Sequence, residues 1–379
     1  MRILFWSELA SPHIGGVEVL THKLMAALCR RGHQVTLITS HAGSPLPDEA
    51  IEDGISVQRL PMQEALRLRR LDLYAQTKRR LIRIKQDFQP DAVHVNFPSP
   101  SVLLHWSSNA HNSAPSLLSI HHTLADLTAG PDTLVGRSLR AAAWIVSNSR
   151  CTNDDTIGGY PQVRDRCSMI YNGLDHPPGP VAALPWDPPR VLCLGRLTRD
   201  KGFDVALAAF AEVRRAIPNC RLTVAGNGPE FDTLNALAAC HDIRDAVDFP
   251  GWVAPADSKS LLNSATLVIV PSLVRESFGL VALEAMQMGR LVIAADTGAL
   301  PELVTHQESG LVTPPGDARA LASAIVQVLS NRELAAGMGA AGRRRALEHF
   351  GLDRYVHEYE SLYARLHAAS ARGEAHAHS

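Results

Sequence analysis

Residues 266–289 read TLVIVPSLVRESFGLVALEAMQMG. The opening run is apolar and rich in β-branched residues, which predicts a short buried strand. The closing stretch predicts a helix that begins near Phe278, and the turn between strand and helix holds Glu276. A strand that runs directly into a helix is the unit from which parallel α/β sheets are built. This stretch therefore predicts an α/β fold.

The same alternation of short apolar runs and longer helical patterns continues in both directions along the chain. The runs are apolar throughout rather than alternating, as expected for parallel sheets that are covered by helices on both faces. Strands that are separated by helices need crossover connections, so we predict doubly wound parallel sheets. The ten expected strands lie at 2–6, 34–39, 55–60, 91–96, 116–121, 143–148, 190–195, 220–226, 266–271 and 291–295.

A proline-rich segment at residues 176–189, HPPGPVAALPWDPP, interrupts this alternation. Proline continues neither a helix nor a central strand, so we interpret the segment as a linker. We expect one Rossmann-like domain at 1–175, a second at 190–351, and an amphipathic helix at 352–371 that packs back on the first domain. Ligands of such sheets bind beyond the carboxyl ends of the strands, so two domains that face one another would form a central cleft.

The composition excludes several classes of protein. Lys and Arg number 37 against 38 Asp and Glu, and this balance gives no general attraction to nucleic acid. The 46% of hydrophobic residues excludes a disordered chain. The N-terminus lacks a signal-peptide pattern, and no window approaches the ~20 apolar residues of a membrane span, so we expect a cytoplasmic protein. The six cysteines form no Cys-x-x-Cys pair and are expected as buried free thiols.

The turn and helix of the opening stretch form a candidate anion site. The unpaired amides of Phe278, Gly279 and Leu280 at the expected helix start favour a phosphate. Glu276 in the turn can accept hydrogen bonds from sugar hydroxyls. Glu284 lies roughly 9 Å along the helix, where it can reach a ribose hydroxyl pair. Two isolated glutamates are more often solvated or helix-capping, but the order of strand, turn and helix favours a binding site.

In this setting the Glu-x7-Glu spacing of Glu276 and Glu284 resembles glycosyltransferase family 4, whose retaining enzymes have two Rossmann-like domains in the GT-B fold. The resemblance covers nearly the whole chain. It implies a first domain that binds the acceptor and a second domain that binds a nucleotide sugar. It further implies transfer of a sugar from a UDP- or GDP-sugar to an acceptor hydroxyl with the anomeric configuration retained. The nucleotide sugar is then a substrate, and no cofactor or metal is implied.

Further motifs of the second domain occur in the order of that family. Arg196 and Lys201, in the segment LGRLTRDKGFD, follow an expected strand and can hold a leaving diphosphate, with a solvated basic loop as the alternative. VAGNGPE resembles the family's Gly-x-Gly-Pro loop, although Gly-Pro also simply makes turns. ADTGALPELV resembles its Gly-Gly-x-Pro-Glu turn, with Thr297 in place of the first Gly. DFPGWV resembles the segment whose backbone contacts the nucleobase, with ordinary packing of the Trp as the alternative. The candidate donor-binding residues here are Gly226, Asn227, Trp252, Val253, Phe278, Gly279, Leu280 and Glu284.

Two motifs of the first domain complete the resemblance. Gly15 and Gly16 match the family's Gly-Gly-x-Glu loop and allow close approach of backbone to the donor phosphates and the acceptor. His121 and His122 end an expected strand, and His121 aligns with the family's His near the transferred sugar. A neutral His can donate a hydrogen bond to a sugar hydroxyl without added charge. The alternative is a His pair that caps the strand.

Residues 66–85, from Leu66 to Lys85, hold eight Lys and Arg residues against Asp72 alone, with apolar residues between them. Such a basic amphipathic helix can lie on an anionic membrane surface, or it can cover the sheet with a solvated basic face. Membrane contact would make the protein peripheral at the inner face of the membrane. It would also favour a lipid-linked acceptor or an envelope glycan.

The resemblance implies a front-face reaction in which the leaving phosphate helps to deprotonate the incoming hydroxyl. The catalytic candidates are His121, Glu276, Arg196 and Lys201, with the last two holding the diphosphate, Glu276 the sugar and Glu284 the ribose. The acceptor is a glycan, a glycolipid or a small molecule. A sugar-nucleotide 2-epimerase and a non-catalytic protein that binds a nucleotide sugar stay open as alternatives.

Overall fold

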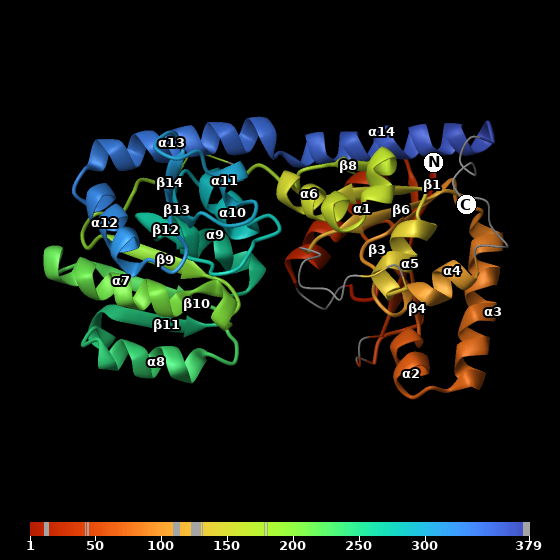
Figure 1. The fold of residues 1–379 in the computed structure, drawn as a ribbon, viewed down its shortest axis with the longest axis horizontal. Helices are drawn as coiled ribbons and strands as arrows, with labels where there is room; N and C mark the ends of the chain where they lie inside the picture. Colours follow the sequence, from red (N-terminus) through yellow and green to blue (C-terminus); the bar gives the residue numbers. More distant parts are fainter. Residues whose placement is uncertain are drawn as a thin grey trace. The chain divides into compact units, whose positions relative to one another are not determined.

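The structure is a computed structural model that divides into two compact units. The first comprises Met1–Gly173 and Leu352–Ser379, and the second comprises Leu174–Gly351. Each unit is an α/β domain built on its own sheet (Figure 1). The boundary after Gly173 lies two residues before the predicted end of the first domain. The described residues are 1–10, 15–41, 43, 45–108, 114–122, 130, 132–177, 179 and 181–373.

The first unit contains an eight-stranded sheet in the order β3-β4-β2-β1-β5-β6-β7-β8. All neighbours pair in parallel except β3, which runs antiparallel to β4. The central strands are buried on both faces, and their apolar residues form the core of the unit. The strands are β1 (Arg2–Trp6), β2 (Gln34–Ser40), β3 (Glu49–Glu52), β4 (Ile55–Leu60), β5 (Ala92–Val95), β6 (Ser116–Ile120), β7 (Trp144–Ser147) and β8 (Cys167–Met169).

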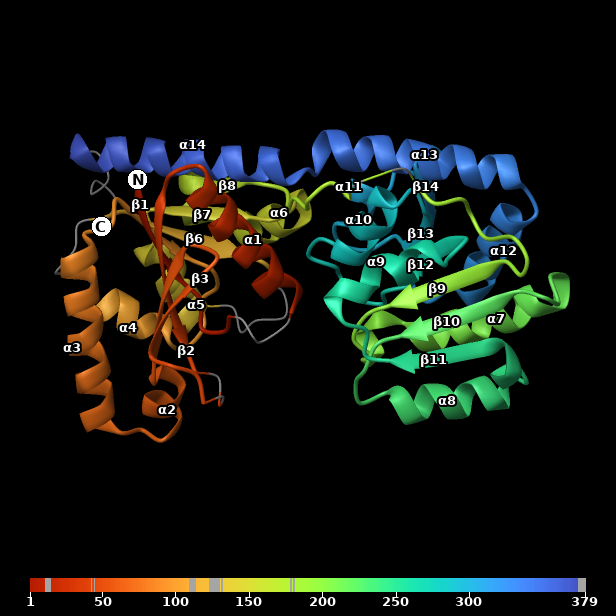
Figure 2. The same ribbon diagram turned by 180° about the vertical axis from the view of Figure 1, so that it is seen from behind.

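Helices cover both faces of this sheet (Figures 1 and 2). The helices are α1 (Gly16–Arg30), α2 (Met62–Arg67), α3 (Leu71–Phe88), α4 (Val102–Ser107), α5 (Leu134–Ala141), α6 (Arg150–Gly159), the 3-10 turn Pro161–Arg166 and α14 (Leu352–Ala371).

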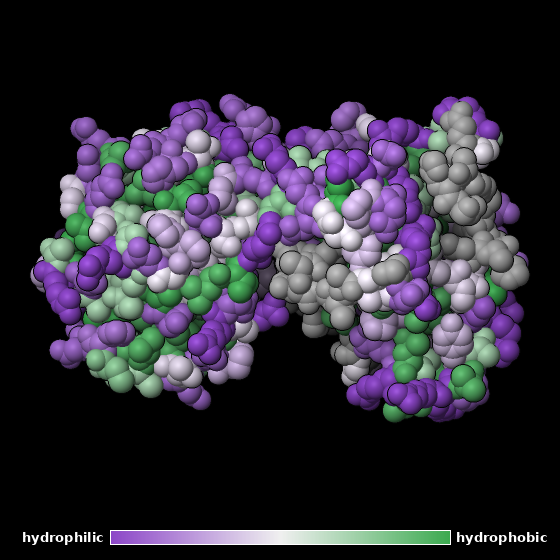
Figure 3. All heavy atoms as spheres, viewed as in Figure 1, coloured by the Kyte–Doolittle hydropathy of each residue, from purple (hydrophilic) through white to green (hydrophobic). Residues whose placement is uncertain are grey.

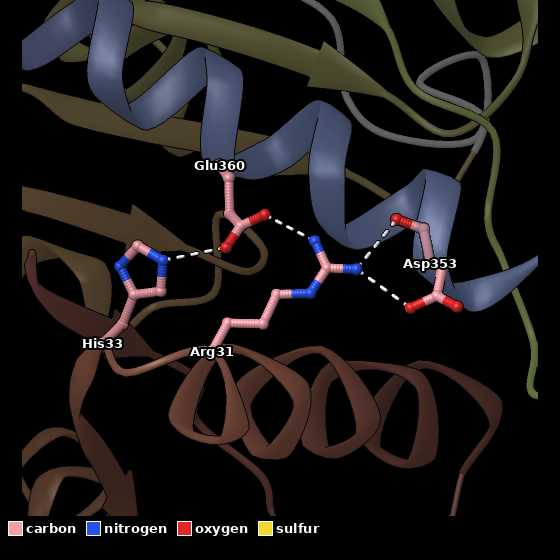
Figure 4. Close-up of polar contacts among 4 residues, drawn as sticks. All are labelled: Arg31, His33, Asp353 and Glu360. Atoms are coloured by element: carbon pink, nitrogen blue, oxygen red, sulfur yellow. Dashed lines mark hydrogen bonds and ion pairs between the residues drawn. The ribbon is translucent and has the colours of Figure 1, made fainter.

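The C-terminal helix α14 belongs to the first unit, where it lies beside α1 (Figure 2) and also contacts β5. Tyrosines spaced four residues apart bury one face of the helix, and the Tyr363 hydroxyl lies 2.6 Å from Nδ1 of His94 on β5. Figure 4 shows the contact with α1, in which Glu360 accepts hydrogen bonds from Arg31 at 2.6 Å and from His33 at 2.9 Å. Arg31 also reaches Asp353 at 2.9 Å.

The second unit contains a six-stranded parallel sheet in the order β11-β10-β9-β12-β13-β14. Its strands are β9 (Arg190–Leu194), β10 (Arg221–Ala225), β11 (Val247–Gly251), β12 (Leu267–Val270), β13 (Leu291–Ala295) and β14 (Gly310–Thr313). Its helices are α7 (Phe203–Ala216), α8 (Phe231–Cys240), α9 (Pro255–Asn263), α10 (Leu280–Gln287), α11 (Leu300–Leu303), α12 (Ala318–Leu329) and α13 (Arg332–His349), with 3-10 turns at Arg199–Lys201 and Arg244–Ala246.

The described part of the proline-rich segment at 176–189 lies within the second unit rather than forming a separate linker. The buried guanidinium of Arg290 donates hydrogen bonds to the carbonyls of Ala182, Ala183 and Ala265. A buried guanidinium needs such acceptors, because leaving its donors unpaired would be costly. The segment is therefore held against the unit by these hydrogen bonds.

All ten predicted strands are present, within one residue at each end, and four further strands are not predicted by the sequence. These four are β3, β8, β11 and β14, and each is an edge strand of its sheet. They are three to five residues long and carry polar, Gly or Pro residues, so their strand structure depends on pairing with a neighbour rather than on an apolar run.

The prediction of one basic helix over 66–85 is wrong. The segment comprises the end of α2, a turn and most of α3. One of its cations, Lys85, is buried: its Nζ lies 3.0 Å from Nδ1 of His105 and 2.8 Å from Oγ of Ser108, and burial lowers its pKa to about 7. The expectation of buried thiols is also only partly right, because Cys240 at the end of α8 is exposed.

Candidate active site

An ion pair stands at the carboxyl edge of the second unit's sheet. Lys201 follows β9 in a 3-10 turn, Glu276 follows β12, and these two strands are neighbours. The Nζ of Lys201 lies 2.6 Å from Oε1 of Glu276. The Ser272 hydroxyl donates to the same oxygen at 2.6 Å. Parallel strands thus bring together two predicted catalytic residues that are 75 positions apart.

This pair is only partly open to solvent, since the side chains of Lys201 and Glu276 are 27% and 15% exposed. The second carboxylate oxygen of Glu276, Oε2, has no hydrogen-bond donor among the described residues, and it can therefore accept from a ligand hydroxyl. The Lys201 ammonium has three donors, of which Glu276 takes one. The pair can thus bind a hydroxyl and an anion side by side.

Gly298 holds the backbone of Glu276 in place. Its φ is +59°, and a Cβ at this position would overlap the backbone of Glu276. The amide of Ala299 donates to the Glu276 carbonyl at 2.8 Å. Only glycine combines the left-handed backbone with this close approach. The turn around Thr297 therefore has the glycine that this contact requires, Gly298. The contact does not require a glycine at position 297.

The Gly-x-Gly-Pro loop after β10 packs on the loop after β9. A Cβ on Gly226 would overlap the carbonyl of Gly195, and one on Gly228 would overlap the carbonyl of Leu197. The Leu197 amide donates to the carbonyl of Asn227 at 2.9 Å. The two glycines therefore permit close approach of two loops that both lie at the carboxyl edge of the sheet.

Three further predicted residues lie at the same edge. Arg196, after β9, is exposed, and its side chain makes no hydrogen bond within the described chain. Trp252 and Val253 follow β11, and the Trp252 side chain is also exposed. Since β11, β10, β9 and β12 are consecutive in the sheet, these residues and the ion pair share one edge.

The helix after this turn starts later than the sequence predicts. The helix α10 begins at Leu280, and Gly279 precedes it with a φ of +100°. Its first-turn amides therefore belong to Leu280 and the two residues after it, not to Phe278. The Phe278 side chain is buried, with its ring 5.9 Å from that of Phe350. Glu284 is half-buried one turn along the helix.

In the first unit, the structure distinguishes the two adjacent histidines. His121 follows β6 and is 3% exposed, whereas His122 is exposed and contacts the ring of Phe97. Burial, together with His122, lowers the pKa of His121 to about 3. The Nε2 of His121 lies 3.0 Å from Oδ1 of Asn96, and the Thr21 hydroxyl donates to the same oxygen at 3.0 Å.

The glycine loop of the first unit is described only from Gly15 onward. Gly15 is the N-terminal cap of α1, Gly16 is exposed, and Glu18 stands in the first turn of the helix. The residues before this loop, 11–14, and those after the histidine pair, 123–129, lie outside the described residues.

Sequence reasoning missed Ser272, Asn96 and Thr21 as members of these sites. Asn96 directly follows β5 and Ser272 stands two residues after β12, so their position after a strand was the available signal. Single polar residues are common in such loops, and only the folded chain shows which of them meet. In the described part of the chain, no three His, Cys, Asp or Glu residues are grouped to hold a metal ion, and no helix is long and apolar enough to cross a bilayer.

Known proteins resemble this chain in both sequence and fold. Glycogen synthase from Mycobacterium tuberculosis is 28% identical over 406 residues, which covers 99% of this chain and 96% of the relative. A GDP-mannose-dependent alpha-(1-6)-phosphatidylinositol monomannoside mannosyltransferase from the same species is 36% identical over 161 residues, 41% of this chain and 42% of the relative.

Solved structures share the fold across both units. Sucrose-phosphate synthase from Thermosynechococcus elongatus has a TM-score of 0.81 at 24% identity and covers 97% of this chain and 99% of its own. HepE from Anabaena, solved with UDP and glucose, has a TM-score of 0.76 at 21% identity and covers 96% and 99%.

Two family models match the chain in succession. The model for Glycosyltransferase Family 4 matches residues 14–177, and the model for Glycosyl transferases group 1 matches residues 181–345. Together they account for nearly the whole of both Rossmann-like units, and the relatives named above are glycosyltransferases. The chain therefore belongs to glycosyltransferase family 4 and is a glycosyltransferase of the GT-B fold.

Proposed function

We propose that this enzyme is a retaining transferase that moves a hexose from a UDP- or GDP-sugar to an acceptor hydroxyl. The observation that carries the proposal is the ion pair of Lys201 and Glu276 at the carboxyl edge of the second unit's sheet. This edge is where open α/β sheets bind their ligands. The pair offers a cation for phosphate and a carboxylate for hydroxyls at the same point.

In this proposal the donor binds along that edge. Lys201 and Arg196 hold the diphosphate, together with the first-turn amides of α10, because charged donors and helix N-termini both favour phosphate oxygens. Glu276 accepts hydrogen bonds from the sugar and Glu284 from the ribose. The exposed ring of Trp252 is available to stack on the base.

The leaving diphosphate gains charge as the glycosidic bond breaks, and preformed donors that face this charge lower the barrier. We propose that the leaving phosphate takes the proton of the incoming hydroxyl on the same face of the sugar, so that configuration is retained. In this scheme His121 of the first unit contacts the transferred sugar. The relatives include a GDP-mannose-dependent enzyme, and the fold neighbour HepE binds UDP and glucose, so both donor bases are candidates.

The acceptor side of the proposal rests on the corner between α2 and α3. Leu68 and Leu71 are 52% and 82% exposed there, and Arg67, Arg69 and Arg70 stand beside them. Figure 3 shows green apolar side chains among purple hydrophilic ones at this end of the unit. Exposed leucines among cations suit an anionic membrane surface. We propose a peripheral enzyme at the cytoplasmic face of the membrane that acts in cell-envelope polysaccharide or glycolipid synthesis.

The test is a screen of UDP-, GDP- and ADP-sugars with the purified protein, in which the released nucleoside diphosphate is measured with and without acceptors. We expect release from a UDP- or GDP-hexose, and an NMR spectrum of the product should show the donor's anomeric configuration. An isomerised nucleotide sugar formed from donor alone would instead show an epimerase. Binding without turnover would show a non-catalytic protein, and an inverted product would refute retention.

A further inference from the structure

Three neighbouring strands of the first unit each end on a buried polar residue. Ser7 directly follows β1, Asn96 follows β5 and His121 follows β6, and these strands are adjacent in the sheet. All three side chains are buried. They form one chain of hydrogen bonds at the carboxyl edge, from Ser7 through Asn96 to His121.

The direction of the hydrogen bond between Ser7 and Asn96 follows from the other contact of the Ser7 hydroxyl. A serine has one proton, and Ser7 Oγ donates it to the carbonyl of Leu9 at 2.7 Å, because a carbonyl oxygen can only accept. The contact of Ser7 Oγ with Asn96 at 3.3 Å must therefore be one in which Asn96 donates through Nδ2. This contact fixes the orientation of the amide, with Nδ2 toward Ser7.

The orientation of the amide then determines the state of the imidazole. The amide oxygen of Asn96 faces both Thr21 Oγ1 and His121 Nε2, each at 3.0 Å. This oxygen has no proton, so the Thr21 hydroxyl and the His121 Nε2 must both donate to it. A neutral imidazole carries one N–H, and Nδ1 of His121 is therefore left with a lone pair.

We infer that Asn96 is a positioning residue that fixes His121 as the Nε2–H tautomer, so that His121 presents Nδ1 as an acceptor for a ligand hydroxyl. Nδ1 is buried and has no hydrogen-bond partner among the described residues. Buried acceptors of this kind are normally satisfied, and a donor must satisfy this one. A sugar hydroxyl can do so, whereas a phosphate or carboxylate oxygen cannot.

This inference corrects the expectation that His121 donates to the sugar. The proton of its neutral ring is already engaged by Asn96, and a second proton is disfavoured because burial lowers the pKa. The tautomer itself follows from the fold of the first unit. Only its kinetic consequence rests on the proposed sugar transfer.

The tautomer is measured without any substrate. In protein labelled with 15N in its histidine rings, long-range proton–nitrogen correlation spectra at pH 7 separate the two tautomers and the cation, and a His121→Gln variant assigns the signal. We expect His121 to be neutral with the proton on Nε2. A proton on Nδ1, or an imidazolium, in the wild-type protein would overturn the inference.

Two variants test the positioning role. Asn96→Leu keeps the size of the side chain but removes the acceptor, and we expect a mixed or altered tautomer signal and a fall in kcat of about 10-fold to 100-fold. Thr21→Val is the matched control for the tautomer, because it removes the other bond to the same oxygen and leaves His121 paired; we expect the wild-type tautomer signal in this variant. Thermal unfolding verifies that both variants are folded.

These measurements separate failure of the inference from failure of the proposed function. An unchanged tautomer and unchanged kcat in folded Asn96→Leu would overturn the positioning role. A protein that transfers no sugar at all, yet shows the expected tautomer in the wild type and its loss in Asn96→Leu, would contradict the proposed function and leave the inference standing.

Discussion

Replacing Lys201 with Met should nearly abolish sugar transfer while the second unit stays folded. The substitution keeps an apolar stem of similar length and removes only the ammonium group, whose Nζ lies 2.6 Å from Oε1 of Glu276. The transition state then loses a cation beside the diphosphate. At the same time the Glu276 carboxylate, which is only 15% exposed, stands without its counter-ion beside an anionic ligand.

The expected loss is two to three orders of magnitude in kcat/KM. Two unit charges 4 Å apart interact by about 4 kcal/mol at an effective dielectric constant of about 20, and the partial exposure of Lys201 reduces this value. Loss of one preformed donor to a developing anion costs about 2.7–4 kcal/mol, or about 10²–10³ in rate. Ser272→Ala removes a neutral donor to the same carboxylate, and we expect about 10-fold or less.

The assay is steady-state release of nucleoside diphosphate with the donor that the screen identifies. Arg199→Met is the matched control, because Arg199 is an exposed cation in the same 3-10 turn. We expect this control to stay within about threefold of the wild type. The double variant of Lys201→Met and Glu276→Gln should lose less than the product of the single losses, since residues in direct contact are not additive.

Retention of more than a tenth of wild-type kcat/KM by folded Lys201→Met would refute this assignment. An equal loss in Arg199→Met would show that net charge of the loop matters rather than the pairing with Glu276. Circular dichroism and thermal unfolding of each variant separate these results from a loss of fold.

Gly298→Ala should lower kcat/KM at least 10-fold, because the new Cβ displaces the Glu276 backbone. Gly337→Ala on α13 is the control: its Cβ would point into open space, so both activity and fold should stay intact. Kinetics and thermal unfolding check both variants. Glu360→Gln should lower Tm by about 2–4 °C at pH 7. Although burial acts to raise the pKa of Glu360, hydrogen bonds from His33 and Arg31 lower it below its unfolded value. The stabilisation that the Glu360 carboxylate gives the folded protein is therefore complete above about pH 4.3 and is lost as the pH falls further. The Tm values of wild type and variant should therefore converge in unfolding scans at acid pH. Replacing Leu68 and Leu71 with Glu should abolish sedimentation with vesicles of anionic lipid and leave transfer to a soluble acceptor unchanged; equal sedimentation would contradict the membrane proposal.

Much of the fold could be predicted because its central strands are continuous apolar runs that are separated by helices. Such runs are apolar on both faces, so the local sequence alone identifies them as strands. The edge strand β11, in contrast, includes Pro250, and β3 alternates exposed and half-buried residues. Their strand structure arises from hydrogen bonds to a neighbour, which the local sequence does not display.

The candidate site was predictable where residues form a motif and not where they meet only in space. Glu276 and Lys201 stand in recognisable segments, and the structure brings them into contact. The predicted start of α10 is two residues too early, because Gly279 has a positive φ and the helix begins only after it, which no sequence pattern before Gly279 indicates. Asn96 and Ser7 are single polar residues after two strands, and they gain meaning only from the order of those strands in the sheet.

The candidate residues of the second unit differ in chemistry from those of the first unit. This difference is consistent with binding of the diphosphate by the second unit and of sugar hydroxyls by the first. The second unit offers charged, partly exposed groups, with Lys201 and Arg196 at the same sheet edge. Charged donors suit a diphosphate, whose oxygens stay hydrated until they are bound. The first unit offers the neutral, buried set of Asn96 and His121, with its tautomer held by hydrogen bonds. A neutral sugar hydroxyl can bind there without the cost of burying a charge, whereas a phosphate cannot. On this reasoning, specificity for the sugar should respond to changes at Asn96, and affinity for the nucleotide should respond to changes at Lys201.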